Sequence, residues 1–369
     1  MKVRKPKMAN KTSSKKTAAK TSKNKEVEDI IAKINKEHGH NAITLGVNAM
    51  TRGYVQEYVS TGILQLDIDL GGGIPIGRYV EISGMESSTK TTLTMHILAN
   101  AQKQGLLCAF LDIEGTSDEP YLRKIGVDVD NLLYSRPSSM EEAVNIVKDL
   151  QMDGRVKFCV YDSVAASLAT LTEINEKDIG ESMQMGRPQQ LLQSMLRRHT
   201  MINNRFVREG EMPFTLIGIN QLREKMGNVY GDPSYTPGGK AKDFSSTINI
   251  RLRQGDYIKE GRDNVVGQVV KYKISKNKIS KRMQSGEVDF YYDCPNQCGV
   301  EGLHYDVKKD LVIVALGFGV VQKAGGWFSY GDLVKVQGME KFAAELMKRE
   351  DLLESIRKEV TTIAKAKKR

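Results

Sequence analysis

The sequence predicts an α/β protein whose core is a mainly parallel sheet carrying a phosphate-binding loop. Two observations support this fold class. Strand-like and helix-like segments alternate from about residue 59 to 290, which is the pattern of a parallel sheet covered by helices on both faces. Within that region an apolar run at 78–83 leads through the loop 84–92 into a helical pattern, the order in which phosphate-binding loops are built. A short N-terminal helical segment and a small C-terminal α/β domain complete the expected architecture.

The basic charge of the chain is concentrated at its N-terminus. The formal net charge of the 369 residues is +10, yet residues 1–25 contain ten Lys or Arg and no acid, and the remainder carries 45 basic and 45 acidic residues. So polar a segment cannot bury a core, and we expect residues 1–25 to be a disordered basic arm. Such an arm is either a solvated tail or a source of non-specific attraction to nucleic-acid phosphate.

The composition argues against a membrane-spanning, secreted or disulfide-rich protein. No apolar run reaches the roughly 18 residues that a membrane span needs, and no apolar block follows the basic start as in a signal peptide. Cys108 and Cys159 lie in apolar strand-like runs, where buried thiols are expected. We therefore expect a cytoplasmic protein without a membrane partner.

Residues 26–58 precede the core and begin with an amphipathic helix, because Val27, Ile30, Ile31 and Ile34 fall on one helical face. That face can pack on a neighbouring subunit or on its own domain, and the sequence does not decide between them. We interpret the segment as a helix/strand element for oligomerisation.

The core is expected over residues 59–303 and the C-terminal domain over 304–369. Strands of the core are predicted at 79–83, 107–112, 132–135, 157–162, 215–220 and 247–253, with helices at 91–104, 140–151 and 188–203. The C-terminal domain is expected to hold a strand at 311–316, an aromatic turn at 327–330, a terminal amphipathic helix and a basic tail. Ligands of such sheets bind beyond the carboxyl ends of the strands.

The loop 84–92 reads Gly-Met-Glu-Ser-Ser-Thr-Lys-Thr-Thr. Its backbone N–H groups would face the phosphates, with Lys90 on the β/γ-phosphates and the Thr91 hydroxyl on Mg²⁺. Thr89 stands where the pattern has glycine, and a β-branched side chain there resists positive φ and crowds the phosphates. The alternative is a loop that has lost nucleotide binding. The predicted nucleotide-binding residues of the loop are Gly84, Glu86, Ser87, Ser88, Thr89, Lys90, Thr91 and Thr92.

Three other strands end in polar side chains at the expected ligand edge. Asp162 closes the strand 157–162 and would belong to the Mg²⁺ shell, unless it only caps a helix. Glu114 follows the strand 107–112 and would orient and deprotonate a water, unless it is an exposed loop residue. Asn220 and Gln221 end another apolar strand, where an uncharged amide can detect a γ-phosphate.

Two long polar loops, at about 173–187 and 222–240, follow strands of the core. Loops of this length inside a compact domain are usually functional or disordered. The first precedes a helix that carries Arg197, and the second holds Arg223, Lys225 and several glycines. Basic loops after nucleotide-sensing strands suit a ligand whose binding depends on the nucleotide; the alternative is two surface loops.

Taken in order, these segments resemble the RecA recombinases of bacteria and their phages. The resemblance extends over about residues 26–350 and rests on 60–70, 84–92, Glu114, 126–133, 162–166, 220–221, 276–278 and 324–330. It implies a DNA-dependent ATPase that uses ATP or dATP with Mg²⁺. It also implies a helical homo-oligomer that assembles on single-stranded DNA and exchanges strands with homologous double-stranded DNA in recombination and repair.

The resemblance also implies roles for individual residues. Asp162 would hold Mg²⁺ through a water, Glu114 would be the base and Gln221 the γ-phosphate sensor. Tyr121 would stack on adenine beside Asp118. Lys276 and Lys278 would reach the ATP of the neighbouring subunit, and Phe244 would be buried at the subunit contact; without the family, a Lys-x-Lys pair on a strand is usually a solvated face. The implied DNA-binding residues are Met185, Gly186, Arg197, Arg223, Lys225, Met226, Gly238 and Gly239.

Three alternatives remain open at the level of sequence. A ring-forming helicase would share the phosphate loop, although the two glycine-bearing loops and the last domain favour recombination. A non-catalytic DNA-binding filament protein has Thr89 as its only support. Cys294 and Cys298 are either free thiols in a turn or part of a zinc site, for which a C-x₃-C pair with His304 supplies too few ligands.

Overall fold

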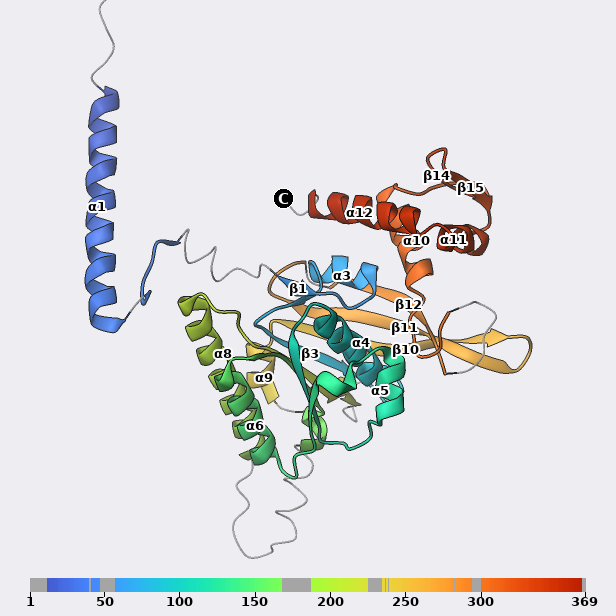
Figure 1. Ribbon diagram of the computed structural model, residues 1–369, viewed down its shortest axis with the longest axis horizontal. Helices are drawn as coiled ribbons and strands as arrows, with labels where there is room; N and C mark the ends of the chain where they lie inside the picture. Colours follow the sequence, from blue (N-terminus) through green and yellow to red (C-terminus); the bar gives the residue numbers. More distant parts are fainter. Residues whose placement is uncertain are drawn as a thin grey trace, which may run out of the picture. The chain divides into compact units, whose positions relative to one another are not determined.

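The computed structural model describes residues 12–39, 41–46, 57–167, 187–224, 234–235, 237, 239–281, 283–293 and 300–366 (Figure 1). The chain divides into two compact units, one made of Met1–Tyr54 with Asn204–Glu211 and the other of Val55–Asn203 with Met212–Arg369. Across the described ranges, no helix has the length and apolar character needed to span a membrane.

The first unit contains the long helix α1, Thr12–His38. The helix expected from residue 26 is therefore present, but it begins well inside the segment expected to be disordered. Lys and Ala in this segment favour helix, so a segment too polar to bury a core can still be helical. Val27 and Ile30 are 39% and 55% exposed. The side chain of Asn35 exchanges two hydrogen bonds with the backbone of Ile43, at 2.9 and 3.0 Å, which fastens the following segment to the helix.

The second unit is built on an eight-stranded sheet with the order β12-β11-β10-β3-β7-β6-β4-β5. The strands from β10 to β5 pair in parallel, whereas β10, β11 and β12 pair antiparallel. The expected mainly parallel sheet is confirmed. The strands are β3 Tyr79–Gly84, β4 Leu107–Asp112, β5 Leu132–Ser135, β6 Val156–Asp162, β7 Thr215–Gln221, β10 Ile248–Glu260, β11 Asn264–Asn277 and β12 Ser285–Tyr291.

Helices cover both faces of this sheet (Figure 1). Alternate residues of a strand enter different apolar clusters: Phe158 and Val160 of β6 face α4, whereas Cys159 and Tyr161 face α6 and α8. Cys108 and Cys159 are buried free thiols, as expected. The helices and shorter elements are α3 Leu64–Leu70, α4 Lys90–Lys103, α5 Glu119–Ile125, η1 Val129–Asn131, α6 Met140–Asp153, α8 Arg187–Glu209, α9 Gly239–Ser245, β1 Tyr58–Val59, β2 Ile74–Pro75, β8 Arg223–Glu224 and β9 Ser234–Tyr235.

The C-terminal region corrects two expectations. The run 311–316, expected as a strand, lies inside helix α10, Val307–Phe318, and the aromatic residues 327–330 form strand β14 instead of a turn. A short apolar run does not distinguish a strand from a buried helix. The helix signals lie outside that run: Asp306 accepts a hydrogen bond from the Lys309 N–H at 2.9 Å, and Gly319 ends the helix at φ 75°.

The remaining elements of this region surround one apolar cluster that includes Phe328, Phe342 and Ile356. The cluster also contacts α3, because Leu64 and Ile68 pack against it. A carboxylate oxygen of Asp310 accepts the Leu64 N–H at 2.7 Å, so the region is fastened to the core by polar as well as apolar contacts. These elements are β13 Gln322–Ala324, β14 Trp327–Tyr330, β15 Val334–Gln337, α11 Met339–Met347 and the expected terminal helix α12, Glu350–Ala366.

His199 of α8 makes the stability of the fold depend on pH. The side chain is buried, its Nε2 lies 3.0 Å from the Phe214 carbonyl oxygen, and burial lowers its pKa from 6.5 to about 4. As the pH falls below 6.5, the His199 ring is therefore protonated in the unfolded chain before it is protonated in the folded chain. The free energy of unfolding falls as a result, until the folded chain is also protonated near pH 4. At pH 5 this loss is about 2 kcal/mol.

We expect His199→Gln to remove this contribution. Between pH 7.5 and pH 5, the difference in unfolding free energy between wild type and variant should shrink by about 2 kcal/mol. Urea denaturation at the two pH values measures it. A difference that stays constant with pH would show that the ring does not titrate in this way.

Candidate nucleotide-binding site

The phosphate loop joins β3, which ends at Gly84, to α4, which begins at Lys90. Gly84 is required sterically, because a Cβ atom there would lie 2.3 Å from the Ser88 Oγ and 2.7 Å from the Leu252 carbonyl oxygen. Both the Ser88 hydroxyl and the Lys90 ammonium donate to the Met85 carbonyl oxygen at 2.7 Å. Burial lowers the pKa of Lys90, while the carboxylates of Asp162 and Glu114 oppose that shift. The loop is thus held together by hydrogen bonds to the Met85 carbonyl, one of them from the Lys90 ammonium.

Thr89 does not prevent the loop from adopting a left-handed conformation. We expected a β-branched residue to resist positive φ, yet Thr89 has φ 62° and ψ 26°, and Ser87 has φ 59°. The Thr89 carbonyl accepts the Leu93 N–H at 2.9 Å and begins helix α4. Its side-chain oxygen accepts a hydrogen bond from the Tyr305 hydroxyl at 3.1 Å. The backbone therefore has the shape that glycine would give, and the helix N-terminus remains available to an anion.

Thr91 and Asp162 meet at the start of this helix. The Thr91 hydroxyl donates to the Asp162 Oδ2 at 2.8 Å, and burial raises the pKa of Asp162 from 3.8 to about 7. No group of three or more His, Cys, Asp or Glu in the described ranges could hold a metal ion. One hydroxyl and one carboxylate nevertheless fit Mg²⁺ of the kind that takes its other ligands from phosphates and water.

Glu114 and Gln221 come together at the same edge of the sheet. Glu114 Oε1 accepts hydrogen bonds from the Ser163 hydroxyl at 2.6 Å and from the Gln221 side-chain amide at 3.2 Å. The sheet places them there because Asp112, two residues before Glu114, pairs with Asp162, and Gly84 pairs with Gln221. Ser163 was not predicted from the sequence as a partner of Glu114, although its position directly after Asp162 was a usable signal.

Tyr121 lies against the phosphate helix, since its hydroxyl and that of Thr92 are 2.6 Å apart. Asp118 caps α5 by accepting the Tyr121 N–H at 3.0 Å. Burial raises the pKa of Tyr121. The contact with Thr92 brings Tyr121, the predicted adenine-binding residue, next to the loop. Asp118 caps the helix in addition to any contact that it makes with a nucleotide.

Lys276 and Lys278 lie at the opposite end of the sheet from the phosphate loop. Their side chains donate to backbone carbonyls at the C-terminal end of α9, Lys276 to Asp243 and Lys278 to Phe244 at 2.8 Å. Asn277, which lies between the two lysines, pairs with Ile248 of β10. Ile248 in turn pairs with Val80, near the start of β3. The phosphate loop instead follows the far end of β3. These lysines therefore do not reach the nucleotide loop of their own chain.

The predicted DNA-binding residues are described only in part. Arg197 is exposed on α8, Arg223 begins strand β8, and Gly239 begins α9. Phe244, near the end of α9, is 76% exposed. The positions that lie outside the described residues are Met185, Gly186, Lys225, Met226, Gly238, Cys294 and Cys298.

Comparison with known proteins identifies the family. The model described as RecA N-terminal domain matches residues 25–295, and the RecA C-terminal domain matches residues 309–365. "Protein RecA" of Thermus thermophilus is 40% identical over 341 residues, covering 92% of this chain and 94% of the relative. "Protein RecA" of Thermus aquaticus is 41% identical over 340 residues with the same coverage, and that of Clostridium acetobutylicum is 39% identical over 338 residues, covering 91% and 89%. The chain belongs to the RecA family of recombinases.

Proposed function

We propose that the cluster at the carboxyl edge of the sheet is the ATPase site of this recombinase. Membership of the family makes the chain a DNA-dependent ATPase that acts in DNA recombination and repair. The observation that supports this assignment most directly is the hydrogen bond between Thr91 and Asp162. It lies beside the loop in which Ser87 and Thr89 are left-handed. Glu114 and Gln221 are hydrogen-bonded at the same edge of the sheet.

Each residue of the cluster then has a definite task. Residues 84–92 bind the phosphates of ATP or dATP through backbone N–H groups and the Lys90 ammonium. Thr91 would hold Mg²⁺ directly and Asp162 through a water, and the ion would supply positive charge where negative charge develops on the phosphates. Glu114 takes the proton of the attacking water, and Gln221 links Glu114 to the γ-phosphate position.

We further propose that Lys276 and Lys278 complete the site of a neighbouring subunit in a helical homo-oligomer. Their location at the other end of the sheet supports this proposal, because a residue that serves another subunit's nucleotide must lie away from its own. The exposure of Phe244 beside them supports a subunit contact at the same place. Hydrolysis would then require assembly, since part of the charge that stabilises the transition state comes from the next subunit.

The proposed nucleic-acid partners are single-stranded DNA and homologous double-stranded DNA. The loops at about 173–187 and 222–240, with Arg197 on α8, would contact mainly phosphate, because strand exchange must tolerate any sequence. Residues 26–58 would take part in oligomerisation, and the basic arm at 1–25 would add non-specific attraction to DNA. We place the protein in the cytoplasm of a bacterium or phage-infected host.

ATP hydrolysis with and without single-stranded DNA tests this proposal, with Lys90→Ala as the control. We expect hydrolysis that DNA stimulates and that the variant loses. No hydrolysis in either condition would favour a binding-only filament. Hexameric rings that translocate along DNA, seen by electron microscopy and unwinding assays, would favour a helicase.

A further inference from the structure

The phosphate loop contains two left-handed residues that are not glycine, Ser87 and Thr89. This backbone conformation is unfavourable for a residue with a Cβ atom and persists only where the surroundings enforce it. Thr89 is the less favourable of the two because it is β-branched. The structure therefore needs contacts that hold the loop in this shape.

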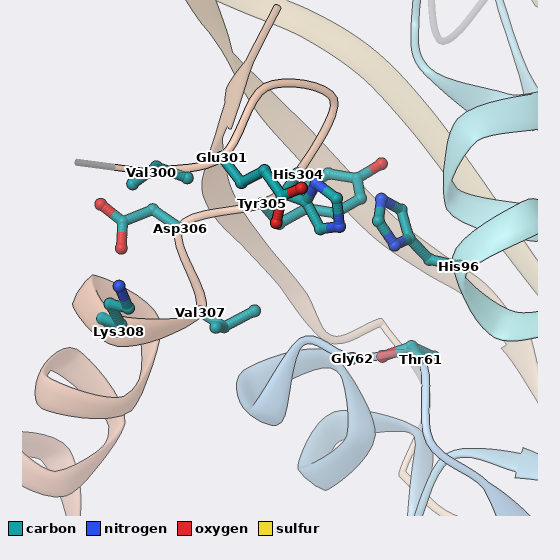
Figure 2. A pocket seen from close by; sticks show the side chains of 10 residues that line it. All are labelled: Thr61, Gly62, His96, Val300, Glu301, His304, Tyr305, Asp306, Val307 and Lys308. Carbon is teal, nitrogen blue, oxygen red and sulfur yellow. The ribbon is translucent and has the colours of Figure 1, made fainter. Parts of the chain in front are cut away.

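Thr89 is held by Tyr305. The Tyr305 hydroxyl donates to the Thr89 side-chain oxygen at 3.1 Å, and Tyr305 is only 4% exposed. Its ring packs edge-on against His96 of α4, with centroids 5.5 Å apart. It also packs at a tilt against the Phe290 ring of β12, with centroids 5.1 Å apart. Tyr305, His304 and His96 line a pocket of about 220 Å³, and Figure 2 shows the Tyr305 ring near His96. The fold thus fixes the point from which the hydroxyl reaches the loop.

Ser87 is held by a side chain of strand β11. Its carbonyl oxygen accepts a hydrogen bond from the Gln268 side-chain amide at 2.9 Å, and Gln268, on β11, is 1% exposed. The Tyr292 hydroxyl donates to the Gln268 Oε1 at 2.9 Å and orients that amide. Both left-handed residues are therefore tied to the segment formed by β11, β12 and Tyr305.

The same segment also fixes the helix that follows the loop. His96 Nε2 lies 2.9 Å from the Leu303 carbonyl oxygen, and burial lowers the pKa of His96 to about 4. The His96 ring is therefore neutral near pH 7. Because a carbonyl oxygen can only accept, the Nε2–H group donates this hydrogen bond. Hydrogen bonds with β11 and with residues 303–305 thus hold both the loop and helix α4.

We propose that Tyr305 and Gln268 are positioning residues for nucleotide binding, which hold Thr89 and Ser87 in the conformation that directs the loop N–H groups at the phosphates. This inference rests on the proposed function of the loop. Tyr305 acts through the Thr89 hydroxyl, so the two residues form a pair. A loop with glycine at position 89 would adopt the left-handed conformation without this support.

The test is a cycle of four proteins: wild type, Tyr305→Phe, Thr89→Gly and the double variant. Loss of one hydrogen bond to the loop should weaken binding of a fluorescent ATP analogue, and raise the KM for ATP, by about threefold to tenfold in Tyr305→Phe. We expect kcat at saturating ATP to stay within about twofold, because the groups that act on the transition state are untouched. In the Thr89→Gly background, Tyr305→Phe should change neither quantity.

Two further measurements separate this mechanism from general damage. Thr89→Val keeps the branched shape and removes the hydroxyl, so it should reproduce Tyr305→Phe. Tyr330→Phe removes a different hydroxyl, which donates to Glu359 at 3.0 Å in the C-terminal cluster, and should leave the KM unchanged. Equal effects of Tyr305→Phe in the wild-type and Thr89→Gly backgrounds, or no effect at all, would overturn the proposal.

Amide hydrogen exchange of residues 84–92 in the nucleotide-free protein provides a readout that does not depend on activity. Exchange should be faster in Tyr305→Phe and in Thr89→Val, but the double variant should match Thr89→Gly. If wild type neither binds nor hydrolyses ATP, the proposed function fails, and the exchange pattern still decides whether Tyr305 supports the loop.

Discussion

Glu114→Gln should abolish most ATP hydrolysis while leaving nucleotide binding nearly intact. A positioned general base contributes about a hundredfold to ten-thousandfold to a rate, and we expect kcat to fall by that factor. The amide of glutamine can still accept the hydrogen bond that the Ser163 hydroxyl donates at 2.6 Å, so the edge of the sheet should keep its geometry. Affinity for ATP should therefore change by only a few fold.

Steady-state hydrolysis in the presence of single-stranded DNA, together with ATP binding at equilibrium, checks this expectation. Glu119→Gln is the matched control, because Glu119 is 61% exposed and pairs with Arg123 on the same helix. It should have little effect on kcat. If Glu114→Gln turned over ATP within about threefold of wild type, Glu114 would not be the base, since that loss is far below what general-base catalysis contributes.

Lys242→Met should destabilise the protein by about 3–5 kcal/mol, because it leaves a buried carboxylate without its partner. The Lys242 ammonium lies 2.6 Å from Oε2 and 2.7 Å from Oε1 of Glu81, and the two side chains are 0% and 1% exposed. Burial raises the pKa of Glu81, whereas Lys242 acts in the opposite direction. Without Lys242 the folded-state pKa of Glu81 should rise further, so the loss of stability should be larger at pH 7.5 than at pH 5.

Urea denaturation of Lys242→Met, alone and combined with Glu81→Gln, checks this prediction. The double variant should recover most of the loss, since no buried charge remains. The exposed pair of Lys348 and Glu345 provides the control, and Lys348→Met should cost less than about 1 kcal/mol. A double variant no more stable than Lys242→Met would show that the pair is not what stabilises this part of the core.

The sequence indicated the nucleotide edge well because its signals are local. The loop 84–92, and the polar residues that end the strands at Asp162 and Gln221, are each recognisable within a few residues of an apolar run. Carboxyl ends of parallel strands meet at one edge of a sheet, so these residues were expected at one edge. There the structure joins Thr91 to Asp162 and Gln221 to Glu114. Local signals failed at 311–316, because the apolar run fits a strand as well as the buried helix that it forms.

The sequence by itself determined the mainly parallel sheet, the loop between its first strand and helix, and which polar residues follow the strand ends at one edge. Only the tertiary structure decided how that loop is supported. The Tyr305 hydroxyl bonds a residue 216 positions earlier in the chain, and Lys242 pairs with a carboxylate 161 positions away. Neither pair can be recognised from a periodic or local pattern in the sequence, because each depends on the packing that brings distant segments together. Thr89, which disagrees with the sequence pattern, is accommodated in the structure by such a contact.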